Sequence, residues 1–283
     1  MLGPIGMLMQ KEVDDIENLL RTRRVVVLTG AGCSTESGIP DYRGEGRPAH
    51  PRVPIQHRDF ITNAEVQRRY WARATLGWAH FRRAQPNAAH RALAELERDG
   101  YITGIITQNV DRLHQAAGSR RVVELHGALA DVVCLQCERM SARDEVHARL
   151  LEHNPRWLES VAELRPDGDA ELAPEWVREF RVVGCTECGG ALKPAVVFFG
   201  GSVEKSTLAR AWELFDEAEA LLVLGSSLAV YSGFRFARRA AQTGRLIAVI
   251  NQGKTRADDL GLVLRSQARL GELLPLIATR LVA

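Results

Sequence analysis

Short apolar runs alternate along the chain with segments whose apolar residues have helical spacing. Val13, Ile16, Leu19 and Leu20 show this spacing near the start of the chain. Continuous apolar runs lie at residues 24–29, 101–107, 122–125, 195–199, 220–224 and 246–250. Such strands between helices are typical of a mostly parallel sheet covered on both faces, so the pattern predicts an α/β fold. Gly100 predicts the end of the helix before the second run.

A Gly-rich segment follows the first predicted strand directly. A parallel sheet binds phosphate groups at such a turn, because glycine lets the backbone approach the ligand and amide groups face the anion. Gly30 and Gly32 are followed next by Gly38, whereas the usual dinucleotide fingerprint would have glycine at Thr35. The loop therefore predicts a nucleotide site unlike that of hydride-transfer enzymes, with a purely structural turn as the alternative.

Short polar residues follow several other predicted strands at their carboxyl ends. They are Gln108, Asn109 and Asp111, then Ser226 and Ser227, and finally Asn251 and Gln252. One such group alone is more often a turn or a helix cap. The carboxyl ends of the strands in a doubly wound sheet face one ligand site, so the recurrence favours partners for ribose, phosphate and carboxamide groups.

Four of the five cysteines form two Cys-x-x-Cys pairs, Cys134 with Cys137 and Cys185 with Cys188. The 47 residues between the pairs exceed the spacing of a compact zinc ribbon. Four thiolates nevertheless suit one tetrahedral zinc ion, and full protein coordination would make that zinc structural. Redox chemistry of the thioredoxin kind is the alternative, but it does not account for two pairs. The fifth, Cys33, is interpreted as a small apolar residue rather than a redox switch.

His126 differs from the other seven histidines because it ends a predicted strand and precedes Gly127. A lone histidine is more often a surface or core residue. Its position in line with the polar groups at the other strand ends favours a catalytic base instead.

Composition restricts the possible partners. The net charge is +2, from 37 basic and 35 acidic residues, which implies no polyanion partner such as nucleic acid. No apolar stretch approaches the roughly 18 residues of a membrane span. Residues 1–9 are apolar, but acidic residues follow them, unlike in a secretory signal. We expect a cytoplasmic protein without a membrane partner, and the sequence leaves its oligomeric state open.

Together these motifs resemble the sirtuins, the silent-information-regulator family of NAD-dependent protein deacylases. The matching segments occur in the family's order and span the chain from about residue 10. Besides the cysteine pairs, they are residues 30–44, 107–114, 125–127, 192–200, 225–230 and 251–253. Segments 40–43, 54–57 and 69–73 resemble the class II branch of the family.

The resemblance implies a Rossmann-like doubly wound parallel sheet with a small domain. The large, NAD-binding domain would comprise residues 10–44, 86–130 and 193–283. A helical insertion at 45–85 and a zinc-binding module at 131–192 would form the small domain. One structural zinc ion would bind Cys134, Cys137, Cys185 and Cys188.

The resemblance also implies an NAD site, with NAD as the co-substrate. Its residues would be Gly30, Ala31, Gly32, Ser34, Glu36, Ile39, Pro40, Asp41, Tyr42, Arg43, Gln108, Asn109, Val110, Asp111, Gly225, Ser226, Ser227, Asn251, Gln252, Gly253 and Leu270. His126 and Asn109 would be catalytic, with His126 taking a proton from a ribose hydroxyl. The products would be free lysine, nicotinamide and O-acyl-ADP-ribose.

An acyl-lysine protein substrate would bind as an added β-strand, between segments 197–200 and 228–230. Val197, Phe198, Gly200 and Val230 are therefore the candidate substrate residues.

Tyr70 and Arg73 are three residues apart on a predicted helix and so share a face. The pair resembles one by which another sirtuin branch recognises acidic acyl groups such as succinyl. An arginine can bind a carboxylate with two hydrogen bonds, and tyrosine can add a third. We favour the alternative, in which Tyr70 packs with Trp71 and Trp78 and Arg73 faces water.

Two other functions use the same residues. A protein ADP-ribosyltransferase would share the NAD site but transfer ADP-ribose to an acceptor side chain. The second is a non-enzymatic sensor of NAD or acyl-lysine, but the presence of His126, Asn109 and Asp111 together favours an enzyme.

Overall fold

The computed structural model describes residues 4–40, 54–157, 174–261 and 264–282. The chain forms two compact units, each built from segments that are distant in sequence. The first unit comprises Met1–Ser37, Gln85–Leu125 and Val203–Ala283. The second unit comprises Gly38–Ala84 and His126–Ser202.

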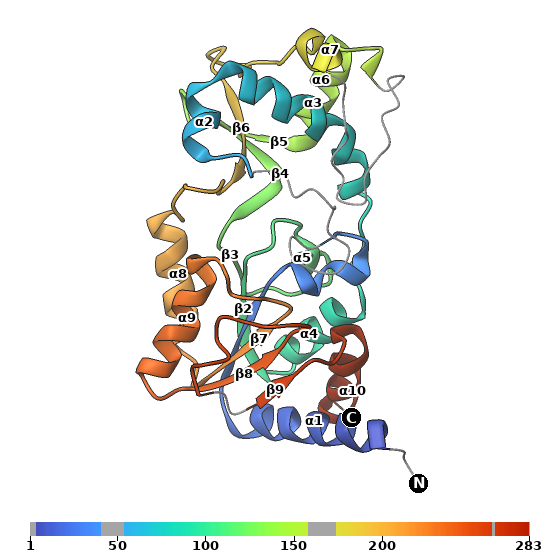
Figure 1. Cartoon of the computed structure of the whole chain (residues 1–283), viewed down its shortest axis with the longest axis vertical. Helices are drawn as coiled ribbons and strands as arrows, with labels where there is room; N and C mark the ends of the chain where they lie inside the picture. Colours follow the sequence, from blue (N-terminus) through green and yellow to red (C-terminus); the bar gives the residue numbers. More distant parts are fainter. Residues whose placement is uncertain (1–3, 41–53, 158–173, 262–263, 283) are drawn as a thin grey trace. The chain divides into compact units, whose positions relative to one another are not determined.

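The first unit contains a six-stranded, wholly parallel sheet with the strand order β3-β2-β1-β7-β8-β9 (Figure 1). Its strands are β1 (Val25–Thr29), β2 (Ile102–Thr107), β3 (Val122–Glu124), β7 (Ala220–Leu224), β8 (Leu246–Ile250) and β9 (Leu264–Ser266). The chain leaves β1 toward one edge of the sheet and resumes at β7 on the other side of β1. The order therefore reverses between β1 and β7, which is where such sheets bind nucleotides.

Helices cover both faces of this sheet. They are α1 (Pro4–Thr22), α4 (Ala88–Arg98), α5 (Leu113–Ala116), α8 (Lys205–Asp216), α9 (Tyr231–Gln242) and α10 (Leu270–Val282), with short 3-10 turns η1 (Ala31–Cys33) and η2 (Thr35–Ser37). Val25 and Val27 of β1 join the core formed with α1, α4 and α10. Val26 and Leu28 join the core formed with α8 and α9. Because alternate residues serve opposite cores, the strand reads as a continuous apolar run, and the predicted fold class is confirmed.

Local signals mark both ends of helix α4, and the sequence predicts the second of them, at Gly100. Helix α4 begins with a capping box, in which the Asn87 side chain accepts the His90 N–H. The helix ends at Arg98, and Gly100 follows with φ +80°, a conformation that favours glycine. Within the described ranges, no helix combines the length and the apolar character that crossing a membrane requires.

The second unit contains a three-stranded antiparallel sheet with the order β5-β4-β6. Its elements are α2 (His57–Thr62), α3 (Ala64–Phe81), β4 (Gly127–Cys134), β5 (Met140–Ala142), α6 (Arg143–His153), α7 (Pro174–Glu179) and β6 (Leu192–Val196). Trp71 belongs to the buried core of this unit, together with Trp157, Phe180 and several aliphatic residues. The Trp71 indole donates a hydrogen bond to the carbonyl of Leu192 at 3.0 Å, which ties α3 to β6.

The prediction of a strand at residues 195–199 in the parallel sheet is wrong. The strand is β6, which starts at Leu192 and pairs antiparallel with β4 in the second unit. After Val196 the chain leaves the ladder, and Phe199 forms an isolated bridge with Gln56. An apolar run shows that a segment is buried, but the partner strand is chosen by contacts distant in sequence.

Glycine at position 225 is required for both conformation and space. Its φ is +59°, and a Cβ there would lie 2.5 Å from the Cys33 nitrogen and 2.6 Å from the Gly32 carbonyl carbon. Gly244 is a matched position, with φ +68° and no atom within 4 Å of an added Cβ.

We expect Gly244→Ala to lower the free energy of unfolding by about 1 kcal/mol, the cost of left-handed backbone for a non-glycine residue. Gly225→Ala should cost roughly 3 kcal/mol or more, since overpacking adds to the same backbone cost. Urea titrations of the two variants and the parent measure both values. Equal losses of unfolding free energy in the two variants would contradict the close approach of Gly225 to Gly32 and Cys33.

Candidate functional site

The loop after β1 lies directly against the loop after β7. Gly30 donates its N–H to the carbonyl of Leu224 at 3.0 Å, and Gly32 donates to the carbonyl of Gly225 at 2.9 Å. A Cβ at Gly30 would lie 2.7 Å from the Ser226 Cβ, and one at Gly32 would lie 2.9 Å from the Gly225 Cα. Only glycine fits at these positions, at the point where the strand order reverses.

Ser34 connects the Gly-rich loop to the polar residues after β2. Its hydroxyl donates to the Asp111 carboxylate at 2.6 Å and accepts from the Asn109 side-chain amide at 3.0 Å. The other carboxylate oxygen of Asp111 accepts the Leu113 N–H at 2.9 Å, at the start of α5. Both Ser34 and Asn109 are buried. Three predicted site residues from two separate loops therefore hold one another in place.

The polar residues after β2 and β7 also meet. The Ser226 hydroxyl donates to the side-chain oxygen of Gln108 at 2.7 Å and accepts the Leu228 N–H at 3.2 Å. The Gly225 N–H bonds the carbonyl of Ile250 at 2.9 Å, which links the end of β7 to the end of β8. The loops after four neighbouring strands thus form one continuous edge in the first unit.

Asn251 shapes the turn after β8. Its side-chain amide donates to the carbonyls of Gln252 at 2.8 Å and Gly253 at 3.4 Å. Arg265 of β9, which was not predicted as a site residue, donates to the Asn251 carbonyl at 2.9 Å and pairs with Asp258 at 3.1 Å. The sequence holds no signal for this role, because the arginines are scattered and β9 is too short to show a pattern.

The remaining predicted cofactor residues of the first unit lie in the loops already described or at the start of α10. Ala31 is in η1, Glu36 is in η2, and Ser227 follows Ser226. The Glu36 carboxylate accepts the Gly271 N–H at 3.4 Å. Leu270 itself is buried in the core beside α4.

Of the other predicted cofactor residues, two belong to the second unit, three lie outside the described residues, and one lies beside Asn109. Ile39 and Pro40 belong to the second unit. Asp41, Tyr42 and Arg43 lie outside the described residues. Val110 follows Asn109 in the half-buried turn after β2.

His126 stands immediately before β4 and is the first residue of the second segment of the second unit. Its carbonyl accepts the Val197 N–H at 2.9 Å. Gly127 has φ +72°, and a Cβ there would lie 2.0 Å from the Ala195 carbonyl oxygen. The backbone of His126 is therefore fixed by the next residue and by the segment after β6, while its side chain is half-buried.

Tyr70 lies in an aromatic cluster of the second unit. Its ring centroid is 5.5 Å from that of Phe60, 5.3 Å from that of Trp71 and 5.6 Å from that of Phe198. Arg73 is half-buried on the same helix. Val197 and Gly200 also belong to the second unit and Val230 to the first, so their role in peptide binding stays a prediction.

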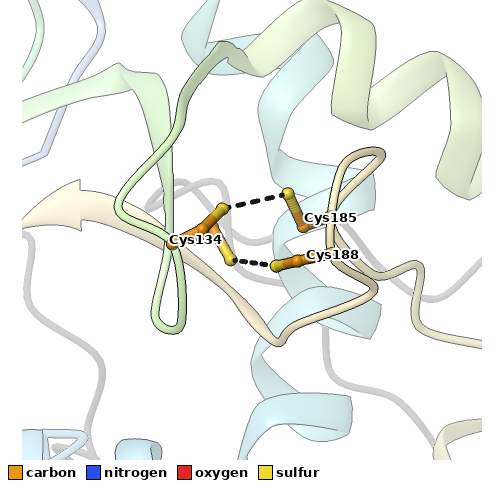
Figure 2. A group of neighbouring side chains, drawn as sticks. Cys134, Cys185 and Cys188 are labelled. Atoms are coloured by element: carbon orange, nitrogen blue, oxygen red, sulfur yellow. Dashed lines mark hydrogen bonds between the residues drawn. The ribbon is translucent and has the colours of Figure 1, made fainter.

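The four paired cysteines form one cluster (Figure 2). The sulfur atoms of Cys134 and Cys188 are 3.5 Å apart, and those of Cys137 and Cys185 are 3.7 Å apart. Zn–S bonds of about 2.3 Å in a tetrahedron place the sulfurs about 3.8 Å apart, so the cluster fits a zinc ion.

Main-chain N–H groups donate hydrogen bonds to the cysteine sulfurs of this cluster. The N–H groups of Cys137 and Gln136 lower the pKa of the Cys134 thiol to about 6, because they stabilise its thiolate. Gly190 donates its N–H to the Cys188 sulfur at 3.4 Å. The Cys134 thiolate, with three further cysteine ligands in place, suits a structural zinc ion.

The chain matches one family model and is similar in sequence to several named proteins. The model of the Sir2 family matches residues 30–232. NAD-dependent protein deacetylase 1 of Streptomyces coelicolor is 52% identical over 266 residues, which are 94% of this chain and 89% of that protein. The human mitochondrial NAD-dependent protein lipoamidase sirtuin-4 is 48% identical over 259 residues, 90% of this chain and 82% of that protein.

Solved structures of Sir2 proteins are also similar to this chain. A Sir2 protein with a p53 peptide and NAD+ superimposes with a TM-score of 0.74 at 31% identity, covering 95% of this chain and 98% of that one. Sir2Tm bound to a propionylated peptide gives a TM-score of 0.73 at 30% identity, with 95% and 98% covered.

We expect Cys188→Ala to lose the zinc ion and to unfold at a markedly lower temperature. Structural zinc supplies on the order of 10 kcal/mol of folding free energy in small modules, and three ligands hold it much less tightly. Elemental analysis with a thermal melt measures both effects. Cys33→Ala is the matched control and should keep one zinc per chain. Full zinc in the Cys188 variant, or a disulfide in place of zinc in the parent, would overturn the assignment.

Proposed function

The chain belongs to the Sir2 family, and from that membership we propose how its own residues remove acyl groups from lysine. It is an NAD-dependent protein deacylase, and its relatives at 48% to 52% identity are named deacetylase, deacylase and lipoamidase. Its substrates are acyl-lysine proteins, and its products are nicotinamide and O-acyl-ADP-ribose. The observation that carries the proposal is the contact of Gly30 and Gly32 with Gly225 where the strand order reverses.

We propose that the Gly-rich loop and the loops at the strand ends each bind a different part of NAD. The backbone of Gly30, Ala31 and Gly32 would approach the pyrophosphate, because no side chain intervenes there. Asn109 and Asp111 would hold the nicotinamide ribose and carboxamide. Their hydrogen bonds to Ser34 support this role, since they orient both side chains before a ligand arrives.

The adenosine half of NAD would lie at the ends of β7 and β8. Ser226, Ser227 and Asn251 would supply hydroxyl and amide partners to this half, and Gln252 would complete the set. The hydrogen bond from Arg265 to the Asn251 carbonyl supports the assignment, because it fixes the turn that carries these groups.

His126 would be the general base. Bound NAD would supply an electrophilic sugar carbon, and the His126 imidazole would accept a proton from a ribose hydroxyl. The hydrogen bond to the His126 carbonyl and the close packing at Gly127 support this role, since a base must be held in position before the proton moves.

We further propose that the protein acts in the cytoplasm. The four clustered cysteines suit a metal site, and thiolate ligands persist best in a reducing compartment. The near-zero net charge supports protein substrates rather than nucleic acid.

We propose that Tyr70 packs against its aromatic neighbours and does not recognise the acyl group of the substrate. Its three aromatic neighbours support this interpretation. Recognition of an acidic acyl group by Tyr70 and Arg73 is the alternative.

The reaction is tested by incubating the protein with NAD and an acetyl-lysine peptide and identifying the products by mass spectrometry. His126→Ala should lower the rate about 10²–10⁴-fold and leave NAD affinity and the thermal melt unchanged. His153→Ala, which removes an exposed histidine of α6, is the control. Activity of the His126 variant within threefold of the parent would exclude this base. ADP-ribosylated protein without O-acyl-ADP-ribose would support the transferase instead.

The acyl preference is tested with acetyl-lysine and glutaryl-lysine peptides of one sequence. If Tyr70 serves packing, Arg73→Ala should change kcat/KM for both peptides by similar factors, within about threefold of each other, because no contact to the acyl carboxylate is lost. An arginine bound to that carboxylate would contribute about 1.5–3 kcal/mol, so its loss would lower turnover of the glutaryl peptide alone by roughly 10–100-fold. That selective loss would support acidic recognition.

A further inference from the structure

Three buried side chains of the first unit gather beneath the Gly-rich loop. Cys33 comes from η1, His90 from α4 and His114 from α5, and each is at most 1% exposed. Their sulfur and nitrogen atoms all lie within 4.8 Å of one another. The Cys33 sulfur is 4.0 Å from His90 Nε2, and the two imidazole centroids are 4.8 Å apart.

One nitrogen of this cluster lacks a partner. His114 Nε2 is 2.9 Å from the Thr29 hydroxyl, whereas His114 Nδ1 is buried and has no hydrogen-bond partner among the described residues. A buried polar atom without a partner is uncommon in native proteins and calls for a ligand or another explanation.

The cluster is electrically neutral near pH 7. Burial lowers the pKa of His114 to about 3 and that of His90 to about 4, so both imidazoles are uncharged. Burial also raises the pKa of the Cys33 thiol well above its ordinary value, so the thiol keeps its proton. Neutral imidazoles have free lone pairs, which is the form that binds metals.

We propose that Cys33, His90 and His114 bind one Cu(I) ion. A sulfur and two imidazole nitrogens form a donor set that suits copper and zinc. Charge decides between the two metals. Cu(I) with one thiolate is neutral overall, whereas Zn(II) with the same ligands leaves a net positive charge in a buried site, which costs desolvation energy. The donor number agrees, because the cluster offers three ligands and structural zinc takes four.

Binding is a ligand exchange without redox change. The thiol proton of Cys33 leaves to solvent as the Cu–S bond forms, and copper stays Cu(I). His90 Nδ1 accepts the Asn87 N–H at 3.3 Å, so the ring proton lies on Nε2 in the free protein. That proton moves to Nδ1 when Nε2 binds copper, at the expense of this long hydrogen bond.

The geometry needs only a small adjustment. Metal bonds of about 2.0–2.3 Å put neighbouring ligand atoms roughly 3.5 Å apart, so separations of up to 4.8 Å must shorten by about 1.3 Å at most. The three ligands lie on three different elements, so the ion would join the Gly-rich loop to α4 and α5.

The test uses the zinc-loaded protein and Cu(I) supplied anaerobically as its bicinchoninate complex. After desalting, copper and zinc are counted in the parent, Cys33→Ala, His114→Gln and the exposed control His153→Gln. The parent and the control should hold one more copper per chain than the other two variants, at equal zinc. Only this difference counts, because the thiols of the four-cysteine cluster also suit Cu(I).

Two measurements keep the result independent of folding defects and of deacylation. Thermal melts without copper show whether each variant folds, and X-ray absorption of the parent gives the ligands of the additional copper. One sulfur and two nitrogens support the proposal. Equal copper in the parent and in the folded Cys33→Ala protein, or additional copper bound by sulfur alone, overturns it.

Discussion

The close approach of two main-chain segments is the constraint on which the nucleotide site depends. Gly30 and Gly32 lie so near Gly225 and Ser226 that no side chain fits between them. This contact fixes the loop after β1 against the loop after β7, at the reversal of strand order where a doubly wound sheet binds its ligand. The polar residues after β2 and β8 then attach to these two loops, through Gln108 and Ser226 on one side and through the Ile250 carbonyl on the other.

The buried hydroxyl of Ser34 shows how such a site is kept rigid. It bonds both Asn109 and Asp111, which come from a different loop. A buried hydrogen bond contributes about 1 kcal/mol net, but removing one partner leaves the other unsatisfied and costs about 1–3 kcal/mol. The hydrogen bonds therefore penalise any other arrangement of these side chains more than they stabilise the fold. A deacylase gains from this rigidity, because its amide and carboxylate groups are oriented before NAD binds.

The second unit obtains its stability differently. Its sheet has three strands, and its core is a short set of aromatic and aliphatic residues around Trp71. The pairing of Cys134 with Leu192 in the ladder brings the two cysteine turns together, although they are distant in sequence. A metal ion that cross-links these turns compensates for the limited core, as in other small zinc modules.

The sequence by itself determined the features that depend on neighbouring residues. Strands β7 and β8 match their apolar runs, the polar groups stand at the strand ends, and the cysteine spacing identifies the metal ligands. Local periodicity and the resemblance to the sirtuins were sufficient for these. Only the tertiary structure decided the partner of β6, the hydrogen bond from Arg265, and the meeting of Cys33 with His90 and His114. These contacts join residues far apart in the chain, and they follow from how helices and strands pack, which no local pattern records.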